Sequence, residues 1–280
     1  MSFKTILVYV SDVEQSKVVL SVAVMMAKRY EAHLTGLHVI PGIQIYPSVG
    51  MYIPEEALAP QRTYHLEKAK KAKAYFSKLT DDEGIMADWR QEESDTPNIS
   101  QQVVDSSHTV DLVILRQPDD ETDDSYLRDL PGDILMESGR PLLIVPNNGT
   151  FQEIGDHILI GWNGTREATR ATFDALPILK TATQVHVHSA ITERPRSDNP
   201  QILGAELATT LARHGVVVSA ETNVNPDLSD GDELLSYVAQ RGADLLVMGG
   251  YGRSRTREMV FGGATHHILK HMIVPVLMSH

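Results

Sequence analysis

The sequence contains no cysteine, which excludes disulfide bonds, thiolate metal sites and catalysis by a cysteine nucleophile. It also contains no apolar run of the length that spans a membrane. The opening residues 1–5 lead straight into an apolar run and lack the pattern of a secretory signal peptide. We therefore expect a cytoplasmic protein that is not associated with a membrane.

Basic residues are outnumbered, with 25 Lys and Arg against 37 Asp and Glu and a formal net charge of −12 at pH 7. Binding to nucleic acid relies on a basic surface, so this balance argues against a nucleic-acid partner. Hydrophobic residues (42%) and charged residues (22%) have the proportions of a globular protein. The 280 residues suffice for one large or two ordinary domains.

The two halves of the chain repeat one order of apolar and helical segments. Each half has a short apolar run, a helical stretch, a second apolar run, a run that follows an Asp and a run that follows a Pro. In the first half these segments are 5–10, 14–30, 33–40, 111–115 and 141–145, and in the second half they are 157–162, 166–179, 184–191, 244–248 and 275–278. Such repetition predicts two copies of one structural unit.

Apolar runs that alternate with helices predict parallel strands buried on both faces. The predicted fold is therefore α/β, with two tandem doubly wound domains, each a mostly parallel five-stranded sheet flanked by helices. The polar turn sequence 147–150 predicts a linker between domains at 1–147 and 154–280. Segment 42–61 is predicted to be a surface loop leading into a helix at 64–79, with a lid or a partner surface as the alternative. Ligands of such folds bind at the carboxyl ends of the strands.

The segment with the clearest chemical signal follows the last Asp-led run. Its glycines and polar residues are Gly249, Gly252, Arg253, Ser254 and Gly262, in the spacing Gly-x2-Gly-x9-Gly, and a helical stretch follows at 264–272. Glycines after a strand let the backbone approach a ligand, and a helix N-terminus attracts an anion. The pattern favours a phosphate-binding loop, although glycines alone also fit a plain turn. It is neither a Walker A motif nor the dinucleotide fingerprint.

This glycine spacing, together with the order of strands and helices, resembles the universal stress protein family over nearly the whole second half. Two such units in one chain resemble the tandem form of that family. The resemblance implies ATP or ADP bound in the cleft at the strand ends, with Mg²⁺ accompanying the phosphates. The residues that it places at the site are Gly161, Trp162, Asn163, Val187, Met248, Gly249, Gly252, Arg253, Ser254, Gly262, Gly263, Ala264 and Thr265.

Two of these positions depart from the family's pattern. Asn163 stands where the family usually has an Asp near the adenosine, and it brings no charge for a metal or a base. Gly263 stands where the family has Ser or Thr, so one hydroxyl group is missing and Thr265 is the candidate to replace it. Val187 is expected to line the adenine pocket.

The first half resembles the family in layout only. Its segment 116–129 has no glycine and is strongly acidic. Clustered carboxylates repel a polyphosphate, so we expect nucleotide in the second half alone. The acidic run is predicted to be a solvated loop, with a divalent-cation site or a partner-docking surface as the alternative.

The resemblance also has consequences for assembly and function. Separate single-domain members of the family associate through their last strands, which implies an internal pseudo-dimer of the two halves and a homodimer of two chains. The implied function is binding of ATP or ADP in a regulatory or stress-response role. The alternatives left open are a slow ATP hydrolase and a structural or interaction module that binds no nucleotide.

Histidine pairs are the remaining candidates for chemistry. His267 and His271 are four residues apart on a predicted helix, and His186 and His188 alternate on a predicted strand. Neither pair has a third ligand nearby in sequence, so structural roles are expected and no metal site is predicted. No Gly-x-Ser-x-Gly motif surrounds a serine, and no catalytic residue is predicted.

Overall fold

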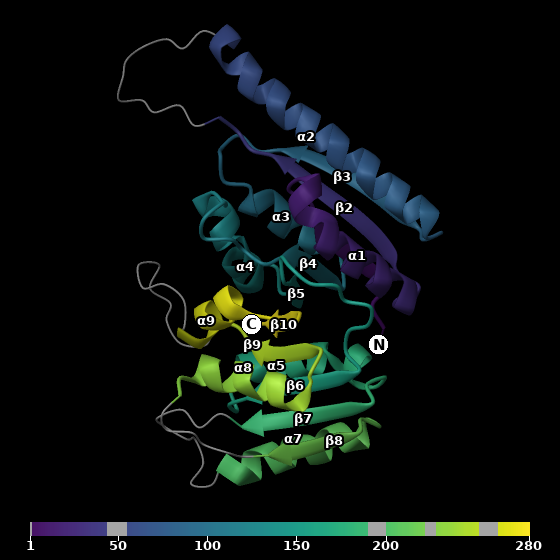
Figure 1. Ribbon diagram of the computed structural model, residues 1–280, viewed down its shortest axis with the longest axis vertical. Coiled ribbons are helices and arrows are strands. Elements are labelled where there is room, and N and C mark those ends of the chain that lie inside the picture. Colours follow the sequence, from purple (N-terminus) through teal and green to yellow (C-terminus); the bar gives the residue numbers. More distant parts are fainter. Residues whose placement is uncertain (1, 44–54, 190–199, 222–227, 252–262) are drawn as a thin grey trace.

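The strands of both halves lie in one sheet in the computed structural model, which describes residues 2–43, 55–189, 200–221, 228–251 and 263–280 (Figure 1). The strands of the first half are β1 (Thr5–Tyr9), β2 (His33–Ile40), β3 (Ala87–Glu93), β4 (Leu112–Arg116) and β5 (Leu142–Val145). Those of the second half are β6 (His157–Trp162), β7 (Gln184–Ser189), β8 (Val218–Glu221), β9 (Leu245–Gly249) and β10 (Val276–Ser279). Within the described residues they form a ten-stranded sheet in the order β3-β2-β1-β4-β5-β10-β9-β6-β7-β8.

Each half contributes five parallel strands, and the halves meet at one antiparallel seam. Strands β5 and β10 pair there, with Ile144 opposite Val276 and Leu142 opposite Met278. All the other strand pairs are parallel. The predicted α/β fold class is therefore confirmed, and the last strands of the two halves associate as the resemblance implied.

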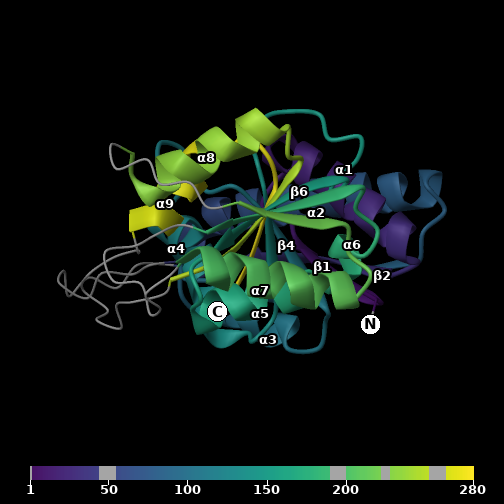
Figure 2. The same cartoon turned by 90° about the horizontal axis from the view of Figure 1, so that it is seen from below.

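Helices cover both faces of the sheet and bury a hydrophobic core on each side. One core is covered by α1 (Val13–Tyr30), α2 (Glu55–Asp82), α5 (Arg166–Asp174), α6 (Leu176–Leu179) and α7 (Pro200–Arg213). The other is covered by α3 (Ser100–Ser107), α4 (Ser125–Glu137), α8 (Asp230–Arg241) and α9 (Gly263–His271). Figure 2 shows the strands fanning out around the long axis of the sheet, the twist expected of parallel strands. None of the described helices combines the length and hydropathy that a membrane span requires.

An aspartate before β4 and another before β9 explain why an Asp leads each of these runs. Asp111 accepts hydrogen bonds from the backbone N–H groups of Lys4 (2.7 Å) and Thr5 (3.0 Å) at the start of β1. Asp244 does the same for Gly155 (2.8 Å) and Asp156 (3.0 Å) before β6. Each carboxylate thus fixes the start of the neighbouring strand.

The structure differs from the predicted elements at three places. The third strand of each half, β3 and β8, was not located from the sequence, because each lies at an edge of the sheet and its residues are mostly part-exposed. The helical stretch 166–179 is divided into α5 and α6, and Pro177 lies in the first turn of α6, where its missing N–H is tolerated. The prediction of a loop at 42–61 was wrong at its end, because α2 begins at Glu55. Residues 44–54 of this segment lie outside the described residues.

Candidate functional site

The carboxyl ends of three strands in the second half meet the first turns of two helices. Strand β6 lies between β7 and β9 in the sheet. The last residue of β9 contacts the start of α5, and the second residue after β9 contacts the first turn of α9. This edge is where ligands of doubly wound folds bind.

Asn163, the residue after β6, shapes the turn into α5. Its exposed side chain accepts hydrogen bonds through Oδ1 from the backbone N–H (3.2 Å) and the hydroxyl (2.8 Å) of Thr165. Thr165 caps α5 in turn, because its Oγ1 accepts from the N–H of Ala168 at 3.3 Å. Within the described part of the chain nothing accepts from the Asn163 Nδ2 group, which leaves a donor at the strand end.

Gly249 is required by close packing inside the protein. A Cβ atom at this position would lie 2.5 Å from the backbone N of Ala168 and 2.8 Å from Cβ of Glu167, both on α5. Gly161, on the neighbouring strand, is limited by Leu234 of α8, whose Cδ2 would lie 3.1 Å from an added Cβ. The close approach predicted from the glycine at 249 therefore exists, but the approaching element is a helix of the same half.

The described start of α9 is open and polar. Gly263 is exposed, and a Cβ atom added there would meet nothing within 4 Å, so the serine or threonine of the family's pattern would fit. Ala264 follows and is part-buried. Thr265 is 4% exposed, and its Oγ1 accepts a hydrogen bond from the N–H of Tyr251 at 3.3 Å. The hydroxyl of Thr265 keeps its own O–H as a donor, and its role as a replacement for the missing hydroxyl stays a prediction.

Several predicted site residues occupy other environments. Val187 is fully buried in the core beneath α5, α6 and α7, and Met248 is 6% exposed in the core on the opposite face. Both residues form the floor of the strand-end region, and their contact with a ligand stays a prediction. The predicted residues Gly252, Arg253, Ser254 and Gly262 lie outside the described residues.

Several polar groups at this edge are buried without a hydrogen-bond partner among the described residues, two of them at neighbouring strand ends. Trp162 and Ser189 are register neighbours at the ends of β6 and β7. The indole Nε1 of Trp162 and the Oγ of Ser189 are both inaccessible and make no hydrogen bond. Unpaired buried polar groups are uncommon and are often satisfied by water or a ligand. The sequence reasoning missed Ser189, although its place at a strand end beside Trp162 was the available signal.

The histidine pairs have structural partners. His188 is 1% exposed, its Nε2 lies 3.3 Å from Oε1 of Glu233, and its ring stacks on Tyr237. Burial lowers the pKa of His188, although Glu233 acts in the opposite direction, so the ring is neutral at pH 7. Nδ1 of His186 lies 2.9 Å from Oγ of Ser219.

The other pair, on α9, is also accounted for. His267 reaches Oδ1 of Asp232 at 2.8 Å, and its ring lies 4.4 Å from that of His271. No group of three or more His, Asp or Glu side chains placed to hold a metal ion occurs among the described residues.

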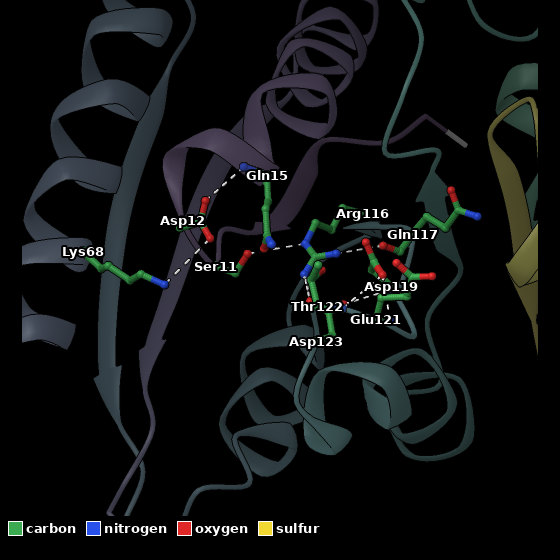
Figure 3. A network of polar contacts seen from close by, with 10 residues as sticks. All are labelled: Ser11, Asp12, Gln15, Lys68, Arg116, Gln117, Asp119, Glu121, Thr122 and Asp123. Carbon is green, nitrogen blue, oxygen red and sulfur yellow. Dashed lines mark hydrogen bonds and ion pairs between the residues drawn. The ribbon is translucent and has the colours of Figure 1, made fainter. Parts of the chain in front are cut away.

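The corresponding edge of the first half is filled by a buried ion pair. Leu112 of β4 pairs with the second residue of β1, and Leu245 of β9 pairs with the second residue of β6. The last residue of each strand lies four positions further along, so Arg116 of β4 and Gly249 of β9 correspond. The guanidinium group of Arg116 pairs with Asp123, with both side chains almost fully buried. Figure 3 shows this pair beside the end of β1, where Arg116 also points toward Ser11.

The acidic segment is folded around this pair. The second carboxylate oxygen of Asp123 accepts the backbone N–H of Asp119 at 2.9 Å. Oδ1 of Asp119 accepts the N–H groups of Glu121 (2.8 Å) and Thr122 (3.2 Å), and these hydrogen bonds lower the pKa of Asp119. The prediction of a solvated loop was therefore wrong for Asp123, because a buried cation from β4 neutralises it.

Comparisons with known proteins agree with this architecture. The model of the Universal stress protein family matches residues 2–122 and 156–280. A universal stress protein from Archaeoglobus fulgidus DSM 4304 aligns over 98% of this chain and 97% of its own at a TM-score of 0.72 and 16% identity. A functionally unknown protein from Pseudomonas aeruginosa PAO1 aligns over 98% and 92% at a TM-score of 0.62 and 16% identity. No curated protein matches the chain in sequence.

A further solved structure is a universal stress protein from Archaeoglobus fulgidus in complex with dAMP, which aligns over 51% of this chain and 98% of its own at a TM-score of 0.36 and 14% identity. At this identity the solved structures show the fold alone. The family match covers most of both halves, from β1 into the acidic segment, short of β5, and from the start of β6 to the end of the chain. The chain therefore belongs to the universal stress protein family.

Proposed function

We propose that the second half binds an adenine nucleotide, ATP or ADP, at the carboxyl ends of β6, β7 and β9, and that binding serves a regulatory or stress-response role. The observation that carries this proposal is the contrast between the halves at equivalent positions. In the first half Arg116 and Asp123 fill the strand end, whereas in the second half the corresponding residue is Gly249 and α9 begins at an exposed Gly263. Adenine as the base rests on the family membership and on the glycine spacing.

The described residues at this edge suit a nucleotide. The N-terminus of α9 offers backbone N–H groups and the positive end of the helix dipole to a phosphate. The exposed Nδ2 group of Asn163 is a donor suited to sugar or base acceptors. Mg²⁺, if it accompanies the phosphates, would take most of its ligands from them and from water, because Asn163 brings no carboxylate.

The two halves would then have different tasks. We propose domains at 1–147 and 154–280, so that each domain contains the five strands of its half. The first domain would bind no nucleotide and would complete the internal pseudo-dimer through β5 and β10. Pairing of two such chains into a homodimer remains a prediction that sedimentation at several concentrations can test.

A charge change at Gly263 gives a selective test. Gly263→Asp meets no steric obstacle and favours a helix N-terminus, but it sets a negative charge against a bound phosphate. We expect the ATP and ADP affinity of this variant, measured by calorimetry, to fall about tenfold or more, while its melting temperature without ligand stays within a few degrees of wild type. Gly263→Ser, the matched control, restores the family's hydroxyl and should bind at least as tightly as wild type.

Mass spectrometry of small molecules released from freshly denatured protein identifies any nucleotide that co-purifies. Absence of a released nucleotide, together with no thermal shift on adding ATP or ADP, would overturn the proposal in favour of a structural module. ATP that turns into ADP over hours, more slowly in Gly263→Asp, would instead indicate the slow hydrolase. An ATP concentration that stays constant over hours would exclude the slow hydrolase.

A further inference from the structure

Tyr251 has an unusual backbone conformation at the start of the glycine loop. Its φ angle is +55°, in the left-handed region that non-glycine residues rarely adopt. Such a conformation is disfavoured for a residue with a Cβ atom and persists only where surrounding contacts hold it. Tyr251 is the second residue after the end of β9.

The contacts that hold Tyr251 come partly from the other half of the molecule. Its phenol ring packs on Gly132 of α4, where an added Cβ would lie 3.4 Å from the tyrosine Oη and 3.5 Å from Cζ. Gly250 packs against the same helix, with Cδ1 of Leu135 at 3.1 Å from the position of a Cβ. Burial raises the pKa of Tyr251, and Asp129 and Asp133 raise it further, so the phenol stays protonated.

The second half holds the same two residues from the opposite side. The N–H of Tyr251 donates to Oγ1 of Thr265 in α9 at 3.3 Å. Gly250 donates its N–H to the carbonyl of Ser279 at 3.0 Å, and its own carbonyl lies 3.1 Å from Nδ1 of His280. Residues 250–251 are therefore clamped between α4 of the first half and the α9–β10 unit of the second.

A reciprocal contact ties α9 to the first half. Nε2 of Gln117, the residue after β4, donates to the carbonyls of Leu269 (2.7 Å) and Lys270 (3.3 Å) near the end of α9. The ammonium group of Lys270 lies 3.4 Å from Oδ2 of Asp120. Figure 1 shows α4 and α9 next to each other across the seam, so the contact of Tyr251 with α4 and the contact of Gln117 with α9 belong to one interface.

We propose that α4 of the first half is a positioning element for the nucleotide site of the second half, acting through Gly132 and Tyr251. The inference rests on the proposed nucleotide binding. A ligand at the start of α9 stabilises the arrangement in which Tyr251 packs on α4, so ligand binding in one half and the stability of α4 in the other are coupled. By linkage the coupling is reciprocal, and a perturbed α4 lowers nucleotide affinity by the same factor.

Two variants on this contact and one control test the coupling. Gly132→Leu displaces the phenol ring yet favours the helix by intrinsic propensity. Tyr251→Gly removes the ring and relieves the left-handed strain, although the loss of the packed ring lowers stability. Met136→Leu changes an exposed residue of the same helix, 45% accessible, and serves as the matched control.

The measurements are ATP affinity by calorimetry and amide hydrogen exchange of peptides from 125–137 with and without ATP. In the wild type and in Met136→Leu we expect ATP to slow exchange in α4. In Gly132→Leu and Tyr251→Gly we expect affinity to fall about 5-fold or more and the ATP effect on α4 to disappear. The altered packing also lowers the melting temperature without ligand, so the ATP effect on α4 is the deciding measurement. A purely structural role would alter the melting temperature and leave the ATP effect on α4 intact.

The possible failures are separable. If wild-type protein binds no ATP, the proposed function fails and the coupling fails with it. If wild type binds ATP but α4 exchanges equally with and without it, or both variants bind as tightly as Met136→Leu, the coupling alone is overturned.

Discussion

Removing the carboxylate of Asp123 should destabilise the first half far more than removing any exposed acid of the same segment. The side chains of Arg116 and Asp123 are 9% and 2% exposed, so the ion pair has almost no solvent screening. Asp123→Ala leaves the guanidinium buried without its counter-ion and leaves the N–H of Asp119 without its acceptor. Breaking a buried pair from one side costs about 3–5 kcal/mol.

Two controls set the scale of this effect. Asp120 pairs with Lys270 on the surface at 3.4 Å, with the two side chains 48% and 54% exposed, and its replacement by Ala should cost about 0–1 kcal/mol. The double change Arg116→Met with Asp123→Leu replaces the pair by apolar side chains, and such replacement is often neutral or stabilising. The double variant should therefore recover most of the stability lost in Asp123→Ala.

The assay can be confined to the first half. The chain has two tryptophans, Trp89 in β3 and Trp162 in β6, so Trp162→Phe leaves a single tryptophan, which lies in the first half. Urea unfolding of each variant in this background, followed by tryptophan emission, gives the change in unfolding free energy. A cost for Asp123→Ala no larger than that for Asp120→Ala would refute the reasoning, because it would mean that Arg116 is solvated without its partner.

Three further outcomes follow from the packing and the charges. Burial raises the pKa of Asp111, but hydrogen bonds from Lys4 and Thr5 outweigh burial and lower it. The stabilisation by this carboxylate is therefore present above pH 3.8 and lost as the pH falls below 3.8. Asp111→Asn should flatten that part of an acid-unfolding curve. The lowered pKa of His188 favours the folded state above 6.5, so stability should decline as the pH falls below 6.5, and less steeply in His188→Gln. Gly249→Ala forces α5 away from β9 and should cost about 1–3 kcal/mol in thermal unfolding, whereas a cost near zero would show that α5 yields freely.

Much of the fold could be predicted because its signals are local. Buried parallel strands are continuous apolar runs, and β2 was predicted with its observed bounds. The edge strands β3 and β8 were not predicted, because a strand with one neighbour is less buried and has fewer apolar residues. The third strands of the two halves can be assigned only when their neighbours in the sheet are known.

The candidate site was predictable in its location more than in the roles of its residues. Asn163 and Gly263 lie at the strand end and helix start, as the pattern indicated. Thr265 was proposed as the replacement for the missing hydroxyl, and the structure adds that its Oγ1 accepts the N–H of Tyr251. Such roles depend on which group a side chain meets across a large sequence separation, and spacing along the chain does not contain that information.

The sequence by itself determined that this protein is two copies of one α/β unit and that only the second copy has the glycine loop. Apolar periodicity, strand-end turns and glycine spacing are properties of neighbouring residues, and they need no knowledge of the rest of the molecule. Only the tertiary structure decided that the copies share one sheet through β5 and β10, that Arg116 and Asp123 neutralise each other, and that Tyr251 rests on α4 of the other half. The seam and the Tyr251 contact join residues far apart in the chain. Arg116 and Asp123 are only seven residues apart, but burial and desolvation at the strand end select them as partners.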